Sequence, residues 1–107
     1  MEAACRGAKA AGGTTVGILP GSDRASANPF VDVAIPTGLG EARNALVVRA
    51  ADSLIAVGGG YGTLSEIALA LKDGNRVVGL ATWDIDGIET AADPEAAVLA
   101  VLGDSLT

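Results

Sequence analysis

The 107-residue sequence contains no histidine and a single cysteine, Cys5. One chain therefore cannot form a disulfide framework, a zinc cluster of cysteine and histidine ligands, or a histidine-based catalytic triad. We interpret Cys5 as a small buried hydrophobic residue rather than as a reactive thiol. No metal site is predicted.

Basic and aromatic residues are also scarce. Seven lysines and arginines stand against thirteen acidic residues, which gives a formal net charge of −6. A surface of this sign repels phosphate backbones, so nucleic acid is excluded as a partner. A phosphorylated small molecule stays compatible, because amide dipoles at contact distance outweigh a diffuse negative field. With Trp83, Tyr61 and Phe30 as the aromatic residues, the core must consist of Ala, Val, Leu and Ile.

Long hydrophobic runs are missing as well. No apolar stretch approaches the roughly 20 residues that a membrane-spanning helix needs. No basic segment followed by an apolar one resembles a signal peptide. We therefore expect no membrane partner and a cytoplasmic location. The length predicts a single domain over residues 1–107.

Hydrophobic patterning predicts strands and helices in alternation. Strands are expected at 14–19, 30–35, 54–57 and 76–80, and helices at 2–11, 41–51, 63–72 and 94–102. Thr63 is predicted to be the N-cap of the third helix, and Asp93 that of the last helix. The alternation predicts an α/β fold of the Rossmann type, a three-layer sandwich with a mostly parallel sheet and helices on both faces.

A glycine-rich segment, Gly58-Gly59-Gly60-Tyr61-Gly62-Thr63, lies between a predicted strand and a predicted helix. Open α/β sheets bind ligands at this edge, and backbone amides at a helix start favour an anion. The segment lacks the lysine of a P-loop, and Ser65 stands where the dinucleotide fingerprint has its third glycine. We predict a phosphate-binding loop. The alternative is a tight turn without a ligand.

Two charged residues are candidates for a site around this loop. Arg43 lies near a predicted helix start, where a cation opposes the helix dipole, so contact with a phosphate or carboxylate would explain its position. The alternative is a solvated side chain or a partner for Glu41 or Glu66. Glu66 follows Thr63 by three residues, which fits a capping box, whereas a carboxylate at the mouth of the phosphate site could act as a base.

Two strings, GGGYGTLSE and GLGEARNALVVRAAD, carry a resemblance that extends over nearly the whole chain. They resemble the LOG-like proteins, often labelled putative lysine decarboxylases, and within them the branch of molybdenum cofactor carrier-like proteins. The resemblance implies a Rossmann-like fold that is N-terminally truncated relative to the family. The resemblance implies that this chain lacks the family's first strand, first helix and second strand. In the family's sheet, these pieces would lie between the strand near Thr15 and the strand near Leu54.

The resemblance also implies roles for individual residues. Arg43 and Glu66 correspond to the catalytic pair of the LOG phosphoribohydrolases. Residues implied in ligand or cofactor binding are Gly58, Gly59, Gly60, Gly62, Thr63, Asn44 and Gly21. The enzymes' pattern Met-His-x-Arg-Lys becomes Gly40-Glu41-Ala42-Arg43-Asn44 here, which lowers the local positive potential and weakens the case for hydrolysis.

The leading hypothesis is a protein that binds a nucleotide-like phosphorylated small ligand, either a nucleoside monophosphate or the molybdenum cofactor, with no cofactor required. One alternative is a LOG-like phosphoribohydrolase that cleaves the N-glycosidic bond of a nucleoside 5′-monophosphate. Another is a non-catalytic oligomerising module, and in each case we expect a homo-oligomer, dimer or tetramer. Asp84 or Asp86 could bind a ribose, or both could belong to a polar turn around Gly87. Trp83 could cover the sheet end or stack on a base.

Overall fold

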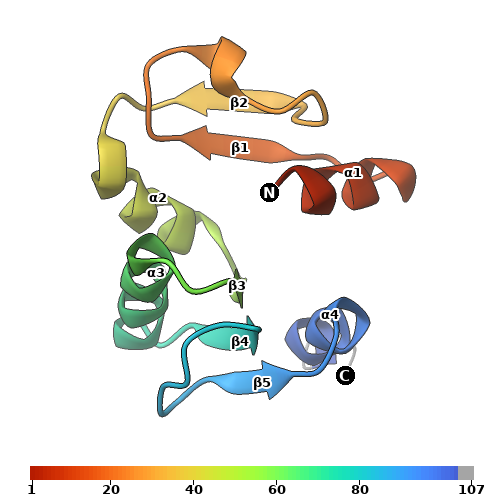
Figure 1. Cartoon of the computed structure of the whole chain (residues 1–107), viewed down its shortest axis with the longest axis vertical. Helices are drawn as coiled ribbons and strands as arrows, with labels where there is room; N and C mark the ends of the chain where they lie inside the picture. Colours follow the sequence, from red (N-terminus) through yellow and green to blue (C-terminus); the bar gives the residue numbers. More distant parts are fainter. Residues whose placement is uncertain (104–107) are drawn as a thin grey trace. The chain divides into compact units, whose positions relative to one another are not determined.

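The computed structural model describes residues 1–103, which fall into two compact units, Met1–Arg43 and a second that begins at Asn44. In Figure 1 every strand runs parallel to its neighbour. The first unit holds a two-stranded sheet, β1 (Val16–Leu19) and β2 (Val33–Pro36), and the second holds β3 (Ser53–Val57), β4 (Arg76–Leu80) and β5 (Glu89–Ala91), in the order β3-β4-β5. The predicted α/β class with parallel strands is confirmed. The assignment of 1–107 to a single domain stays a prediction.

The first unit begins with α1 (Glu2–Ala10), which ends before Gly12, a glycine with φ of +82°. The helix was predicted at 2–11, and a glycine of positive φ commonly follows a helix end. Helix α1 has no buried residue, and Cys5 is partly exposed, so the interpretation of Cys5 as buried is wrong. The link from β1 to β2 contains a short 3-10 helix, η1 (Arg24–Ser26).

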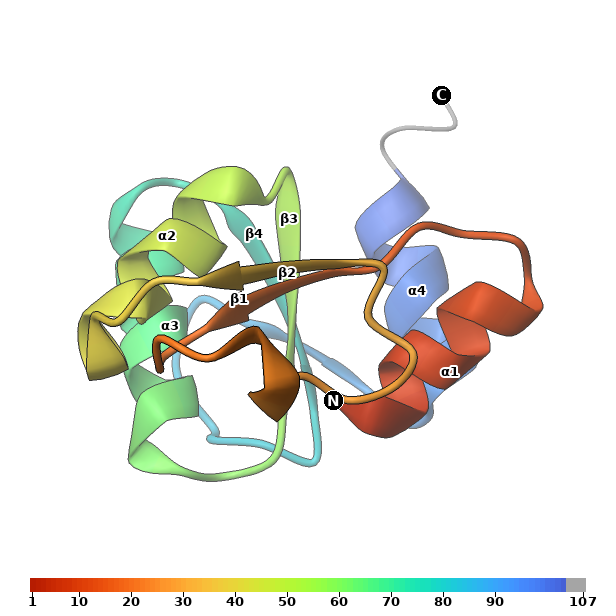
Figure 2. The same ribbon diagram turned by 90° about the horizontal axis from the view of Figure 1, so that it is seen from above.

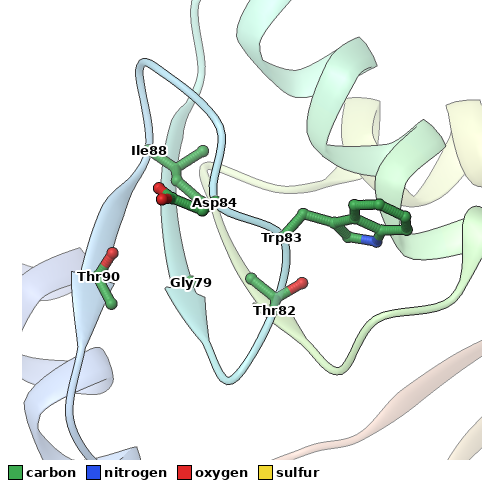
Figure 3. A pocket seen from close by; sticks show the side chains of 6 residues that line it. All are labelled: Gly79, Thr82, Trp83, Asp84, Ile88 and Thr90. Carbon is green, nitrogen blue, oxygen red and sulfur yellow. The ribbon is translucent and has the colours of Figure 1, made fainter.

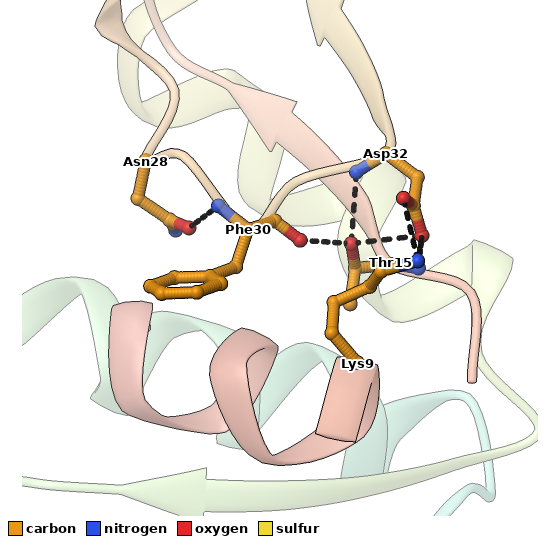
Figure 4. A network of polar contacts seen from close by, with 5 residues as sticks. All are labelled: Lys9, Thr15, Asn28, Phe30 and Asp32. Atoms are coloured by element: carbon orange, nitrogen blue, oxygen red, sulfur yellow. Dashed lines mark hydrogen bonds and ion pairs between the residues drawn. The ribbon is translucent and has the colours of Figure 1, made fainter. Parts of the chain in front are cut away.

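A polar network ties the entry of β1 to the entry of β2 (Figure 4). The backbone N–H of Thr15 donates to the Asp32 carboxylate at 2.9 Å, and the Asp32 N–H donates to the Thr15 hydroxyl at 2.8 Å. Lys9 on α1 adds an ion pair to Asp32, with 2.9 Å between Nζ and Oδ1. The Thr15 N–H, followed by Lys9, lowers the pKa of Asp32 below its ordinary value. The network therefore favours the ionised carboxylate in the folded chain.

We expect Asp32→Asn to lower the midpoint of thermal unfolding at pH 7, because the amide keeps one acceptor oxygen but loses the charge that Lys9 pairs with. Because folding lowers the pKa of Asp32, the ionised carboxylate stabilises the fold at pH values above the pKa of the unfolded chain. This stabilisation is lost as the pH falls through the lower pKa of the folded chain. The difference between wild type and variant should therefore shrink below about pH 4. Thermal melts followed by circular dichroism from pH 7 to pH 3 measure it.

Glu41→Gln is the matched control, because Glu41 is an exposed acidic residue of the same unit. Its melting midpoint should stay close to that of the wild type across the same range. A destabilisation by Asp32→Asn that is constant from pH 7 to pH 3 would contradict the assigned role of the charge.

The second unit has helices on both faces of its sheet. Helix α3 (Tyr61–Lys72) packs on one side of β3 and β4, and α4 (Pro94–Leu102) packs on the other side (Figures 1 and 2). A core of small aliphatic residues lies between the sheet and α3, and α2 (Arg43–Ala50) contributes Val48 to it. The other members are Ala56, Ile67, Ala70 and Val77. Trp83, Ile85 and Ile88 pack at the edge of this core. The predicted aliphatic core is confirmed here.

The edge strand β5 is held to β4 by both backbone and side chains. Arg76 donates from Nε and Nη2 to the two carboxylate oxygens of Glu89, at 2.9 and 3.1 Å. This fork-shaped contact lowers the pKa of Glu89. The three-residue β5 was not predicted, because ETA lacks the run of β-branched or aromatic residues that marks a strand.

The start of α3 differs from the prediction. The helix begins at Tyr61 with Gly60 as its N-cap, so Thr63 is the third helical residue and its prediction as the N-cap is wrong. Glu66 then lies too far along the helix for a capping box. By contrast, Asp93 caps α4 as predicted, because its carboxylate accepts from the N–H of Ala96 at 2.7 Å. Within residues 1–103 no helix has the length and apolar character that crossing a membrane requires.

Candidate functional site

The glycine loop leaves the carboxyl end of β3 and enters α3. Gly58 has φ of +82°, a conformation that favours glycine. Its carbonyl oxygen accepts a hydrogen bond from the Thr82 hydroxyl, and the carbonyl oxygen of Gly60 accepts one from the Trp83 indole N–H at 3.1 Å. Two carbonyl groups of the loop are thus hydrogen-bonded to side chains of the segment that follows β4.

The amides of the loop are left without acceptors. Among residues 1–103, no hydrogen bond is accepted from the backbone N–H of any residue from Gly59 to Thr63. Gly59 and Gly60 are exposed, and a Cβ added to either would meet no heavy atom within 4 Å. Packing therefore does not require glycine at these two positions. Their small size leaves open space above a row of unpaired donors at a helix start.

Asn44 adds a side-chain polar group at the same place. It lies in the first turn of α2, and only 5% of its surface is exposed. Its Nδ2 lies 3.8 Å from the position that a Gly62 Cβ would occupy. In the described part of the chain its side chain forms no hydrogen bond, and its amide atoms keep some accessible surface, since Arg43 Nε is the buried side-chain nitrogen or oxygen without a partner there. An amide in this position beside the loop can donate to, or accept from, a bound ligand.

Two aromatic rings and a cavity lie next to the loop. Tyr61, which is 83% exposed, stacks on Trp83 with 6.1 Å between the ring centroids. Behind Trp83 lies a cavity of about 230 Å³ between β4 and β5 (Figure 3). Its lining consists of Gly79, Thr82, Trp83, Asp84, Ile88 and Thr90. Trp83 thus touches the glycine loop and also lines the cavity.

The remaining predicted site residues are Arg43, Gly21 and Glu66. Arg43, the last residue of the first unit, donates from Nη1 to the carbonyl oxygen of Ile18 at 2.7 Å, and its buried Nε has no partner within residues 1–103. This contact with β1 was not predicted. Gly21 follows β1 and accepts from the N–H of Gly38 at 2.9 Å. Glu66 is half-buried on α3 in the second unit. The catalytic role of Arg43 and Glu66 stays a prediction.

The cavity and part of its lining were not predicted from the sequence. Asp84 was weighed as a ribose ligand or as part of a polar turn, and Thr82, Ile88 and Thr90 were not singled out. The signal that could have found them is the polar stretch after β4, since residues following the carboxyl ends of parallel strands meet at one edge. Gly87, with φ of +102°, confirms the predicted turn in this stretch.

The model of the SLOG cluster4 family matches residues 1–103 of the chain. An uncharacterized protein of Archaeoglobus fulgidus is 50% identical over 99 residues, which cover 92% of this chain and 65% of that protein. The chain therefore spans less than two thirds of this relative's length.

Two solved structures are similar over nearly the whole chain. The molybdenum cofactor binding protein from Rippkaea orientalis has a TM-score of 0.88 and 40% identity, covering 100% of this chain and 71% of that protein. The molybdenum cofactor carrier protein from Chlamydomonas reinhardtii has a TM-score of 0.82 and 41% identity, covering 97% and 69%. At this identity the likeness extends beyond the fold to sequence.

Proposed function

The chain belongs to the SLOG cluster4 family, and we propose that it binds a phosphorylated small molecule whose phosphate lies on the backbone amides between Gly59 and Thr63. The observation that carries this proposal is the row of N–H groups that have no acceptor within the described residues. Such a row at a helix start, together with the positive end of the helix dipole, favours an anion.

The open space above the loop supports the same function. A phosphate oxygen must come within about 2.9 Å of an amide nitrogen to accept its hydrogen bond. Side chains at Gly59 and Gly60 would occupy the approach, whereas within residues 1–103 no heavy atom lies within 4 Å of the place that either Cβ would take. The Asn44 amide beside Gly62 supplies a further donor for a phosphate or sugar oxygen.

The solved relatives narrow the choice of ligand. Two of them are described as binding or carrying the molybdenum cofactor. We propose this cofactor or a nucleoside monophosphate as the ligand, with the chain acting as a carrier. The net charge of −6 does not oppose this, because charge-assisted hydrogen bonds of about 1.5 to 3 kcal/mol each act at contact distance.

Calorimetric titration of the 107-residue chain tests the phosphate site. We expect heat on adding GMP or AMP, competition by inorganic phosphate, and affinities at least about tenfold weaker for guanosine and adenosine, which lack the charged acceptor. Equal affinity for a nucleotide and its nucleoside would contradict a phosphate site at the loop. The absence of heat with every phosphorylated probe, in a folded sample, would reject the function.

A further inference from the structure

The cavity between β4 and β5 is attached to the glycine loop through its own walls. Thr82 and Trp83, which line it, donate to the carbonyl oxygens of Gly58 and Gly60. The Trp83 ring and the Asp84 carboxylate point in opposite directions in Figure 3. The glycine loop and the cavity therefore share Thr82 and Trp83.

The walls of the cavity are positioned by close packing. A Cβ on Gly79 would lie 2.7 Å from Thr82 Cγ2 and 3.1 Å from Ile88 Cδ1, so only glycine lets these two side chains sit over β4. Thr90 on β5 is the register partner of Gly79 and lines the same cavity. Because strands and packed side chains set it, the shape of this cavity can discriminate between ligands.

Asp84 is the charged residue in the lining. Within residues 1–103 its carboxylate forms no ion pair or hydrogen bond with another side chain, and it is exposed. The Thr82 hydroxyl already donates its hydrogen to Gly58. The lining therefore offers two carboxylate oxygens as strong acceptors, next to the apolar surface of Ile88.

This polarity is opposite to that of the glycine loop. The loop presents N–H donors, which suit a phosphate, whereas a carboxylate repels a phosphate and attracts N–H groups. The ligand that fits both has an anionic end and a heterocyclic end rich in N–H donors. A carboxylate accepts best from two adjacent donors, because its two oxygens can then be used together.

Few biological heterocycles present two adjacent N–H donors. The 2-amino-4-oxo ring of guanine and of pterin has an amino group next to a ring N–H. Adenine and cytosine instead place the amino group beside an acceptor nitrogen, and uracil has one N–H between two carbonyls. Against these three, one carboxylate oxygen would face a lone pair.

On the premise that the proposed phosphate site exists, we propose that Asp84 accepts the two adjacent N–H groups of a 2-amino-4-oxo ring, guanine or pterin, seated between β4 and β5. The phosphate of the same molecule lies on the glycine loop, on the other side of Trp83. The cavity then determines which phosphorylated heterocycle the chain selects.

Calorimetric titration of the 107-residue chain with GMP, AMP and neopterin monophosphate tests the selection. We expect GMP and the pterin to bind roughly ten- to a hundredfold tighter than AMP, the discrimination typical of a bidentate contact. Asp84→Asn should reduce that ratio at least about tenfold, because an amide offers one donor and one acceptor, the pattern that matches adenine. Asp86→Asn removes the same charge from an exposed position of the same segment, outside the lining, and should keep the ratio.

The outcomes separate this proposal from the phosphate site. Equal affinities for GMP and AMP, or an unchanged ratio in Asp84→Asn, would overturn the role of Asp84 and leave phosphate binding intact. The failure of all three probes to bind would overturn both proposals. A preference for guanosine over adenosine that Asp84→Asn removes would support the cavity even without phosphate. Tighter binding of neopterin monophosphate than of GMP identifies pterin as the source of the ring, and the reverse identifies guanine.

Discussion

Gly60→Val is expected to weaken GMP binding at least about tenfold, because the new side chain occupies the space through which a phosphate oxygen approaches the loop amides. Loss of a single charge-assisted hydrogen bond, worth about 1.5 to 3 kcal/mol, already accounts for a change of that size. In the structure, a Cβ on Gly60 meets no atom within 4 Å, so the chain itself does not resist the substitution. Calorimetric titration with GMP measures the loss.

The fold should survive this substitution. Gly60 has φ of −73° and ψ of 162°, an extended conformation that valine adopts readily. Valine is a poorer N-cap than glycine, which costs about 1 kcal/mol and lowers the melting midpoint by a few degrees. A folded Gly60→Val variant with wild-type affinity for GMP would remove the loop from the binding site.

Gly7→Val is the matched control for this experiment. Gly7 lies in α1, outside the loop, and a Cβ added to it also meets nothing within 4 Å. The variant carries the same change in side-chain size at an open position. It should bind GMP as the wild type does, so a loss of affinity in both variants would indicate a general effect on the chain.

Ile67→Ala is expected to give the largest loss of stability. Ile67 on α3 has no exposed surface, and it packs with Val48, Ala56, Ala70 and Val77 between helix and sheet. Removing three carbon atoms there leaves a cavity, and such changes cost about 2 to 5 kcal/mol. For a chain of this size the melting midpoint should fall by roughly 8 °C or more. Urea denaturation followed by circular dichroism measures the free energy of unfolding.

Leu99→Ala serves as the comparison, because Leu99 is 66% exposed on α4. Substitutions at exposed positions usually change the free energy of unfolding by no more than about 0.5 kcal/mol. If Ile67→Ala cost as little as Leu99→Ala, the aliphatic cluster would not be the core of the second unit.

Local patterns in the sequence were sufficient for most of the helices and strands. The strand at 76–80 and the helix that Asp93 caps before Pro94 were predicted at their observed bounds. Both signals act over a few residues, since an apolar run and a capping side chain need no distant partner. The start of α3 was predicted two residues late, because Gly62 has a low helix propensity that the structure overrides.

Contacts between distant residues could not be predicted in the same way. Trp83 donates to Gly60 across 23 positions, and Arg43 donates to Ile18 across 25. The Arg76–Glu89 contact between β4 and β5 likewise joins residues that are 13 positions apart. Such contacts form only once the chain has folded, and no periodicity in the sequence encodes them.

By itself the sequence determined the α/β class, the aliphatic character of the core and the position of the glycine loop, because each follows from the order of neighbouring residues. Only the tertiary structure decided that the loop amides have no acceptor within residues 1–103, that the Asn44 side chain lies beside Gly62, and that a cavity lined by Asp84 adjoins Trp83. The physical reason is that helices and strands arise from local backbone preferences, whereas a site arises from side chains brought together by packing.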